Sequence, residues 1–245
     1  MHSKRQAITL EELTGDISFT RQDWYGEGMT AVFDGDPVGV IFNGGLDDPN
    51  YDTEFRMTGT SDASQLFKYL KRYAPVLHSW LTPAELDTPI TGRLPWKAVL
   101  TIPEASSDGI SAPTRLTLQS SLMGLDVDLP WPFGKTSEEQ KPLSIRTATS
   151  QNGNSQTRVD FGSTVDMEID QIRRADGTKE TQRVEIVLGE DRPVFERQSG
   201  LTMRGRIARL PLNEWIAFAK TAASSAKSSG VELPISFNVD MSFST

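Results

Sequence analysis

Apolar and polar residues alternate along several stretches of this chain, a pattern typical of β-strands that bury one face. The clearest stretch is 235–243, where Ile235, Phe237, Val239, Met241 and Phe243 point to one side and polar residues to the other. Residues 115–122, 165–169, 184–188 and 201–207 show the same period, and their apolar positions include Leu116, Leu118, Leu122, Val165, Met167, Ile169, Val184, Ile186, Leu201 and Met203. We predict that these strands form an antiparallel sheet.

The first sixty residues read as a β-meander. Short β-prone runs at 17–20, 28–33, 38–43 and 53–59 are separated by turn residues, of which Asp34-Gly35-Asp36-Pro37 is the clearest group. Gly and Asp tolerate the positive φ of tight turns, so neighbouring runs are expected to be hairpin partners. We divide the chain into a meander at 1–60 and a sheet segment with short helices at 61–245, while one continuous domain remains the alternative.

Two segments carry helical spacing instead. Asp62 can cap a helix over 62–74, and Asn213 or its neighbours can begin one over 212–226 that contains Trp215 and Ile216. Each segment follows a strand and a glycine, at Gly59 and at Gly205. This weak internal repeat indicates modular extension of the sheet.

Composition narrows the class of protein. The formal net charge is −8 and no basic stripe is present, which argues against a nucleic-acid partner. Cysteine is absent, so disulfides, thiolate metal sites and thiol nucleophiles are excluded. No run reaches the ~18 apolar residues of a membrane span, and no signal-peptide core follows Met1. An export signal or membrane anchor would therefore lie outside this chain.

Residues suited to chemistry are sparse. The two histidines are His2 and His78, and no nucleophile-elbow glycine pattern surrounds His78. Asp126 and Asp128 share one side of a short strand, which is ordinary patterning of a solvated face. We expect no catalytic residue, no metal site and no cofactor.

Four motifs occur in a recognisable order. They are Gly-x-x-Pro-Trp at 92–96, Ser-x-Leu-x-Gly-Leu at 120–125, Leu-Pro-x-Pro-x-Gly-Lys at 129–135, and Gly-Leu-x-x-x-Gly at 200–205 before Trp215. In this order and spacing they resemble the YhdP branch of the AsmA-like bacterial envelope proteins. The resemblance covers residues 85–220, roughly, and residues 1–50 carry no motif of this kind.

The resemblance implies a periplasmic segment of a larger chain that is anchored to the inner membrane. It implies a mainly β fold, a twisted antiparallel sheet curled into an elongated groove with two short helices, which shields phospholipid or another acyl lipid on its way to the outer membrane. The candidate lipid-binding residues are Leu116, Leu118, Leu122, Val165, Met167, Ile169, Val184, Ile186, Leu201, Met203, Ile235, Phe237 and Val239.

Alternation alone leaves other interpretations open. Every half-buried sheet requires it, so the same residues can pack into a closed core. A non-catalytic scaffold or protein-interaction module would use a filled core and an exposed sheet edge. A hydrolase would need a cleft with convergent carboxylates.

Overall fold

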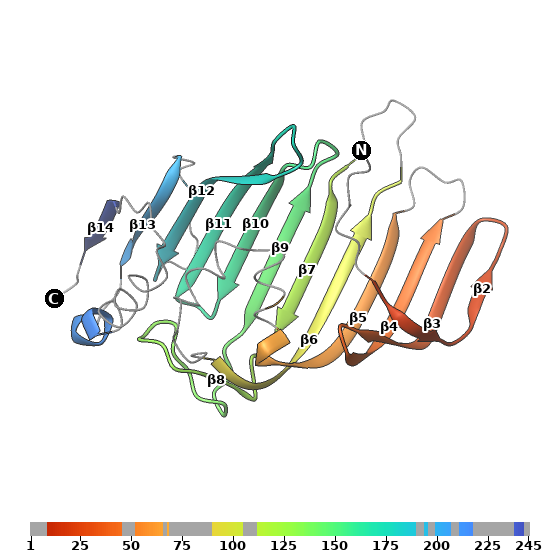
Figure 1. The fold of residues 1–245 in the computed structure, drawn as a ribbon, viewed down its shortest axis with the longest axis horizontal. Helices are drawn as coiled ribbons and strands as arrows, with labels where there is room; N and C mark the ends of the chain where they lie inside the picture. Colours follow the sequence, from red (N-terminus) through yellow and green to blue (C-terminus); the bar gives the residue numbers. More distant parts are fainter. Residues whose placement is uncertain are drawn as a thin grey trace.

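The fold is one long layer of strands lying side by side (Figure 1). The structure is a computed structural model, and it describes residues 9–45, 52–65, 68, 90–104, 112–189, 194–195, 199–206, 211–217 and 238–242. The strands are β1 (Glu11–Thr14), β2 (Ile17–Phe19), β3 (Asp23–Phe33), β4 (Asp36–Gly45), β5 (Thr53–Asp62), β6 (Ile90–Ile102), β7 (Thr114–Ser120), β8 (Leu125–Val127), β9 (Leu143–Thr149), β10 (Ser155–Phe161), β11 (Val165–Arg173), β12 (Lys179–Leu188), β13 (Gly200–Arg206) and β14 (Asn238–Ser242).

These strands form one open sheet in the order β1-β3-β4-β5-β6-β7-β9-β10-β11-β12-β13-β14, with β2 beside β3 and β8 beside β6. Among the described strands, β1 and β14 stand at opposite ends of this order and do not pair, so the sheet is not closed into a barrel. The prediction of a mainly β fold is confirmed. β5 spans residue 60 and pairs with β6 along its length, and the division into 1–60 and 61–245 stays a prediction.

Pairing is antiparallel from β1 to β12, as the alternation and turn signals predict. The prediction of antiparallel pairing is wrong for the strands predicted at 201–207 and 235–243. β12 pairs with β13, and β13 with β14, in parallel. A parallel pair needs a connection that crosses the sheet instead of a hairpin turn. Phe195, in the connection from β12 to β13, lies over the guanidinium of Arg158 on β10, 5.1 Å from ring centroid to Cζ.

The connection between β7 and β9 folds over one face of the sheet, and we call residues 121–142, which include β8, the cap. β8 pairs with the start of β6, where the backbones of Gly92 and Gly124 approach closely. A Cβ atom at Gly92 would lie 2.2 Å from the carbonyl oxygen of Gly124, and both glycines have positive φ. This close approach therefore depends on glycine at both positions.

A buried lysine holds the cap together. Lys135 is 5% exposed, and its ammonium donates to the carbonyl oxygens of Leu122 at 2.9 Å, of Thr136 at 2.6 Å and of Leu125. Burial lowers the pKa of Lys135, an effect that nearby carboxylates partly offset. Three backbone carbonyls thus share one cation, which compensates their removal from water.

Two helical segments border the same face, in agreement with the two short helices predicted. Residues 63–65 and 68 are helical, and Asp62 caps this turn by accepting a hydrogen bond from the Ser64 amide at 2.9 Å. Residues 212–217 form the second helix, in which Trp215 donates from Nε1 to the Trp131 carbonyl at 2.9 Å. The remainder of both predicted helices lies outside the described residues.

Candidate functional site

A single row of apolar residues crosses ten strands of the sheet, from β3 to β13. Each of its members lies directly opposite the next across the strand pairing. This central row consists of Met29, Val40, Met57, Ala98, Leu118, Ile145, Val159, Met167, Ile186 and Met203. At about 4.8 Å between strands, the row is roughly 43 Å long. We call the face of the sheet that carries this row the apolar face.

The sequence-predicted site residues lie mostly on this face, but they differ in burial. Val165, Met167, Ile169, Val184 and Ile186 are at most 5% exposed. The half-buried ones are Leu116, Leu118, Leu201 and Met203. Leu122 is 2% exposed and was predicted to lie in the strand 115–122, but β7 ends at Ser120 and Leu122 lies in the turn that follows. Val239 lies in β14 opposite Met203, while Ile235 and Phe237 lie outside the described residues.

The cap covers one part of the apolar face. Leu122, Leu125 and Val127 form one buried cluster with sheet residues, together with Ala63, Ile90 and Leu94. We call the sheet residues of this cluster the sealed region: Val159, Val165, Met167, Ile169, Val184, Ile186 and Leu188. Phe133 of the cap stacks on Phe161 with ring centroids 6.1 Å apart. The protein itself therefore fills the space over β10 to β12.

Further along the same face, β7, β9 and the end of β6 at Leu100 are less covered. Leu100, Leu116, Leu118 and Ile145 are half-buried, and we call them the half-buried region. Register places Leu100 opposite Leu116, and Leu118 opposite Ile145. Leu100 and Ile145 were missed as site residues by sequence reasoning, although Ile145 lies between the polar residues Ser144 and Arg146.

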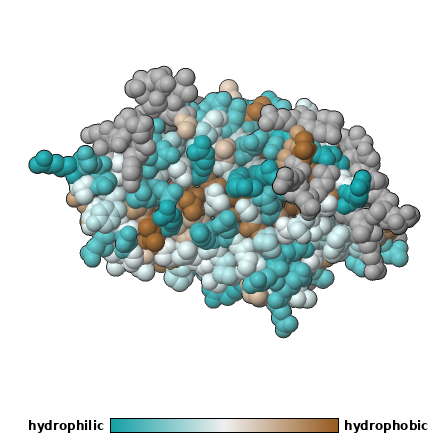
Figure 2. Space-filling model, turned by 180° about the vertical axis from the view of Figure 1, so that it is seen from behind, coloured by the Kyte–Doolittle hydropathy of each residue, from teal (hydrophilic) through white to brown (hydrophobic). Residues whose placement is uncertain are grey.

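The opposite face of the sheet carries charged side chains, and we call it the charged face. Arg146 on β9 pairs with Asp160 on β10, and Arg158 bridges Asp160 at 3.2 Å and Asp166 on β11 at 3.7 Å. Seen from behind, the molecule is mostly hydrophilic, with hydrophobic residues in a broken band across its middle (Figure 2). By contrast, the apolar-face positions of β5 to β10, from Thr53 to Phe161, carry no charged side chain.

Two ionisable groups on this charged face have shifted pKa values. Burial raises the pKa of Asp166 to about 6, and its hydrogen bond to Asp160 and repulsion from that carboxylate add to the effect. Burial lowers the pKa of Arg183, but hydrogen bonds donated to Glu168 and Asp170 outweigh it and raise the pKa above its ordinary value. Both shifts arise within ion-pair networks that neutralise the partners.

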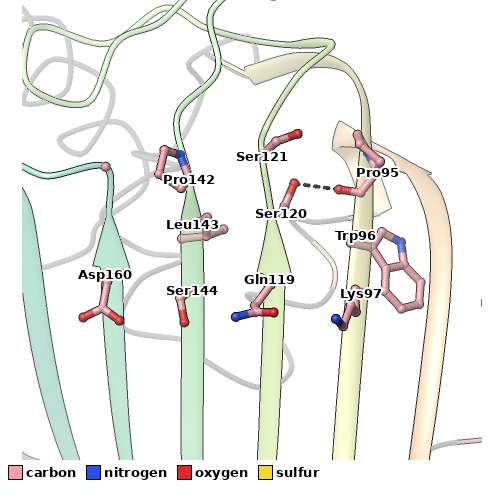
Figure 3. Close-up of a pocket in the computed structure, with 11 residues that line it drawn as sticks. Pro95, Trp96, Lys97, Gln119, Ser120, Ser121, Pro142, Leu143, Ser144 and Asp160 are labelled. Carbon is pink, nitrogen blue, oxygen red and sulfur yellow. Dashed lines mark hydrogen bonds between the residues drawn. The ribbon is translucent and has the colours of Figure 1, made fainter.

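A shallow hollow of about 590 Å³ lies across the strand ends next to the cap (Figure 3). Lys97, Gln119, Ser144 and Asp160 line it from four neighbouring strands. Asp160 is the one carboxylate in the lining, and Arg146 and Arg158 hold it. Asp166 faces Asp160 but does not line the hollow. A single, neutralised carboxylate is a poor basis for acid–base chemistry.

Comparison with known proteins gives one match, to the family model described as YhdP protein, over residues 1–245. The chain belongs to the YhdP family. The resemblance carried by residues 85–220 is thereby confirmed and extends over the entire YhdP-family chain. Neither a curated protein nor a solved structure matches it.

Neither a membrane-spanning helix nor a metal-binding cluster is found among the described residues of this YhdP-family segment. None of the helices described is long and apolar enough to cross a membrane. Nor do three or more histidine or carboxylate side chains gather there in a way that could hold a metal ion. The apolar face, across which the central row continues, is the candidate functional site on which the proposal below is built.

Proposed function

We propose that this chain forms one section of a conduit that shields the acyl chains of phospholipid during transport between the inner and outer membranes. The central row carries the proposal, because it continues across ten strands without a charge or a gap in register. The section works without catalysis, and it lies in the periplasm as part of a larger chain anchored to the inner membrane.

The energetics of lipid transfer explain why such continuity matters. At about 0.8 kcal/mol per methylene, two acyl chains of about 16 carbons lose on the order of 25 kcal/mol when they are exposed to water. A gap in apolar shielding would therefore stop a lipid. The central row can offer such shielding where its side chains stay part exposed, at Leu118, Ile145 and Met203.

Within this proposal, lipid tails contact the half-buried region and not the sealed region. Leu118 and Ile145 keep part of their surface free, whereas Ile186 is 1% exposed and belongs to the buried cluster that the cap residues join. The sequence-predicted residues of β11 and β12 support the sheet from within its core. Leu201 and Met203, on the far side of the sealed region, are half-buried again and extend the contact surface.

A photoreactive amino acid placed at position 118 tests this contact. In cells, crosslinking from 118 should yield an adduct with phospholipid, because the side chain points to the apolar face. The neighbouring position 119 is the matched control, since Gln119 lies on the same strand and points to the charged face. Absence of a lipid adduct at 118, or equal adducts at both positions, would contradict the proposal.

The alternative is a non-catalytic envelope scaffold or protein-interaction module, and one observation favours it. The edge strand β2 exposes Phe19 to 69% and Ile17 to 43%. Exposed apolar side chains at a sheet edge suit pairing with a partner strand. If the chain isolated from cells carries a partner protein but no lipid, and Phe19→Ser releases that partner, the scaffold is the better interpretation.

A further inference from the structure

A second row crosses the apolar face, parallel to the central row and near the strand ends opposite the cap. Its members are uncharged and polar, and we call them the neutral polar row: Thr114 on β7, Thr149 on β9, Ser155 on β10, Gln171 on β11 and Thr181 on β12. Each lies opposite the next in the strand pairing. Five neighbouring strands thus align uncharged side chains that can form hydrogen bonds.

The β10 to β12 part of this row is hydrogen-bonded internally. Ser155 Oγ donates to Gln171 Oε1 at 3.5 Å, and Gln171 Nε2 donates to Thr181 Oγ1 at 3.3 Å. The hydroxyls of Thr114 and Thr149 are half-buried, and neither bonds to the part of the chain that the structure describes. These two hydroxyls are available to a ligand.

The distance along the strands fits a lipid. From Thr149 to Leu143, at the cap end of β9, the chain advances six residues, or about 20 Å at roughly 3.3 Å per residue. Half of a bilayer that is about 40–45 Å thick with its head groups measures about 20–22 Å. A phospholipid lying along the strands would therefore place its head group at one end of β9 and its tail ends at the other.

We propose that the neutral polar row receives the head-group region of a glycerophospholipid, through its ester carbonyls and phosphate oxygens, while the tails lie over the half-buried region. Hydroxyls donate to oxygen acceptors without selecting a net charge, so zwitterionic and anionic lipids are accepted alike. This inference rests on the proposed function. It adds the orientation of the lipid and the reason for broad head-group acceptance.

Threonine also suits strands for reasons unrelated to ligands, since its branched side chain packs well on a half-buried sheet. That simpler origin predicts that loss of the hydroxyls leaves lipid binding unchanged. The double variant Thr114→Val/Thr149→Val separates the two, because valine keeps the branched shape and removes only the hydroxyl. Thr117→Val is the matched control on the charged face of β7.

The experiment uses the full chain incubated with vesicles of equal parts phosphatidylethanolamine and phosphatidylglycerol, and in parallel with hexadecane, which has no head group. After re-isolation, bound molecules are quantified by mass spectrometry. We expect the double variant to retain about three- to tenfold less phospholipid, as for the loss of one or two hydrogen bonds, with hexadecane unchanged. Wild type should carry the two phospholipids in their vesicle ratio, and Thr117→Val should match wild type.

Equal phospholipid retention by the double variant and wild type would overturn the head-group assignment and leave the conduit proposal standing. If wild type binds neither phospholipid nor hexadecane, both the head-group assignment and the conduit proposal are overturned. An inserted charge gives an independent readout: Thr149→Lys should enrich phosphatidylglycerol about two- to fivefold, and Thr149→Glu should deplete it. Unchanged lipid composition in both variants would also overturn the assignment.

Discussion

The sealed region and the half-buried region occupy the same face of the same sheet, yet they serve different purposes. Ile186 and Leu118 both belong to the central row, and each follows a polar residue, Glu185 and Thr117. Ile186 lies in the cluster that the cap completes, while Leu118 keeps part of its surface free. Alternation therefore determines which way a side chain points, and long-range packing decides what covers it.

The largest expected effect separates the regions by stability. Ile186→Ala should lower the free energy of unfolding by about 4 kcal/mol, because a side chain that is 1% exposed leaves a cavity in a packed core. Leu118→Ala should cost only about 1–2 kcal/mol, since its side chain is already part exposed. Urea unfolding monitored by tryptophan fluorescence measures both.

Thr117→Ala, on the charged face of β7, serves as the control and should change stability little. Equal losses for Ile186→Ala and Leu118→Ala would mean that the two regions are covered alike. The distinction between lipid-contacting and core residues would then have to be abandoned.

Much of the sheet is predictable from the sequence, because strand alternation is a local signal. The strands at 165–169 and 184–188 fall within β11 and β12, and their apolar residues point to one face as predicted. β9 and β10 escaped notice because Thr147 and Thr157 occupy apolar-face positions and dilute the pattern. Their hydroxyls bond to each other at 3.0 Å, a contact that only the pairing of the strands reveals.

A smaller effect is expected from loosening the cap. Lys135→Met keeps the length of the side chain but leaves three carbonyls without their shared donor, so it should cost about 2 kcal/mol. Amide hydrogen exchange should rise within 121–139, at the start of β6 that pairs with β8, and over the sealed region, while β3 and β4 stay protected as before. This change would make the sealed region more accessible to solvent, as the half-buried region already is.

Lys97→Met is the matched control, because Lys97 is exposed on the charged face. If exchange rises equally across β4 and β11, the cap does not act locally. The division of the apolar face would then reflect the whole sheet and not the cap.

The cap and the parallel strands show what sequence reasoning could not reach. The buried position of Lys135 could not be predicted from the sequence. A lysine after a glycine is typical of a polar turn, and its three carbonyl partners come together only in the folded chain. The parallel pairing of β12 with β13 was likewise hidden, since strands 184–188 and 201–207 look alike whichever direction they pair. Strand direction depends on the connection between the two strands, and the sequence 189–199 carries no periodicity.

The smallest expected effect tests what lies behind the sealed region. Asp166 projects from β11 to the charged face, and its pKa is raised to about 6, first by burial and then by Asp160. A pKa above the unfolded value means that the protonated form favours folding, so this contribution is complete below about pH 4 and is lost as pH rises through about 6. Asp166→Asn should remove that loss and be more stable than wild type at pH 7.5, by on the order of 1 kcal/mol or less because solvent screens the pair.

Unfolding midpoints of Asp166→Asn and wild type, compared from pH 4 to 8, should diverge as pH rises. Asp126→Asn, at an exposed carboxylate on β8, should run parallel to wild type throughout. A constant offset between Asp166→Asn and wild type would show that Arg158 already neutralises Asp166 in full. In that case the charged network supports the sealed region equally at every pH, and the contrast with the half-buried region depends on the cap alone.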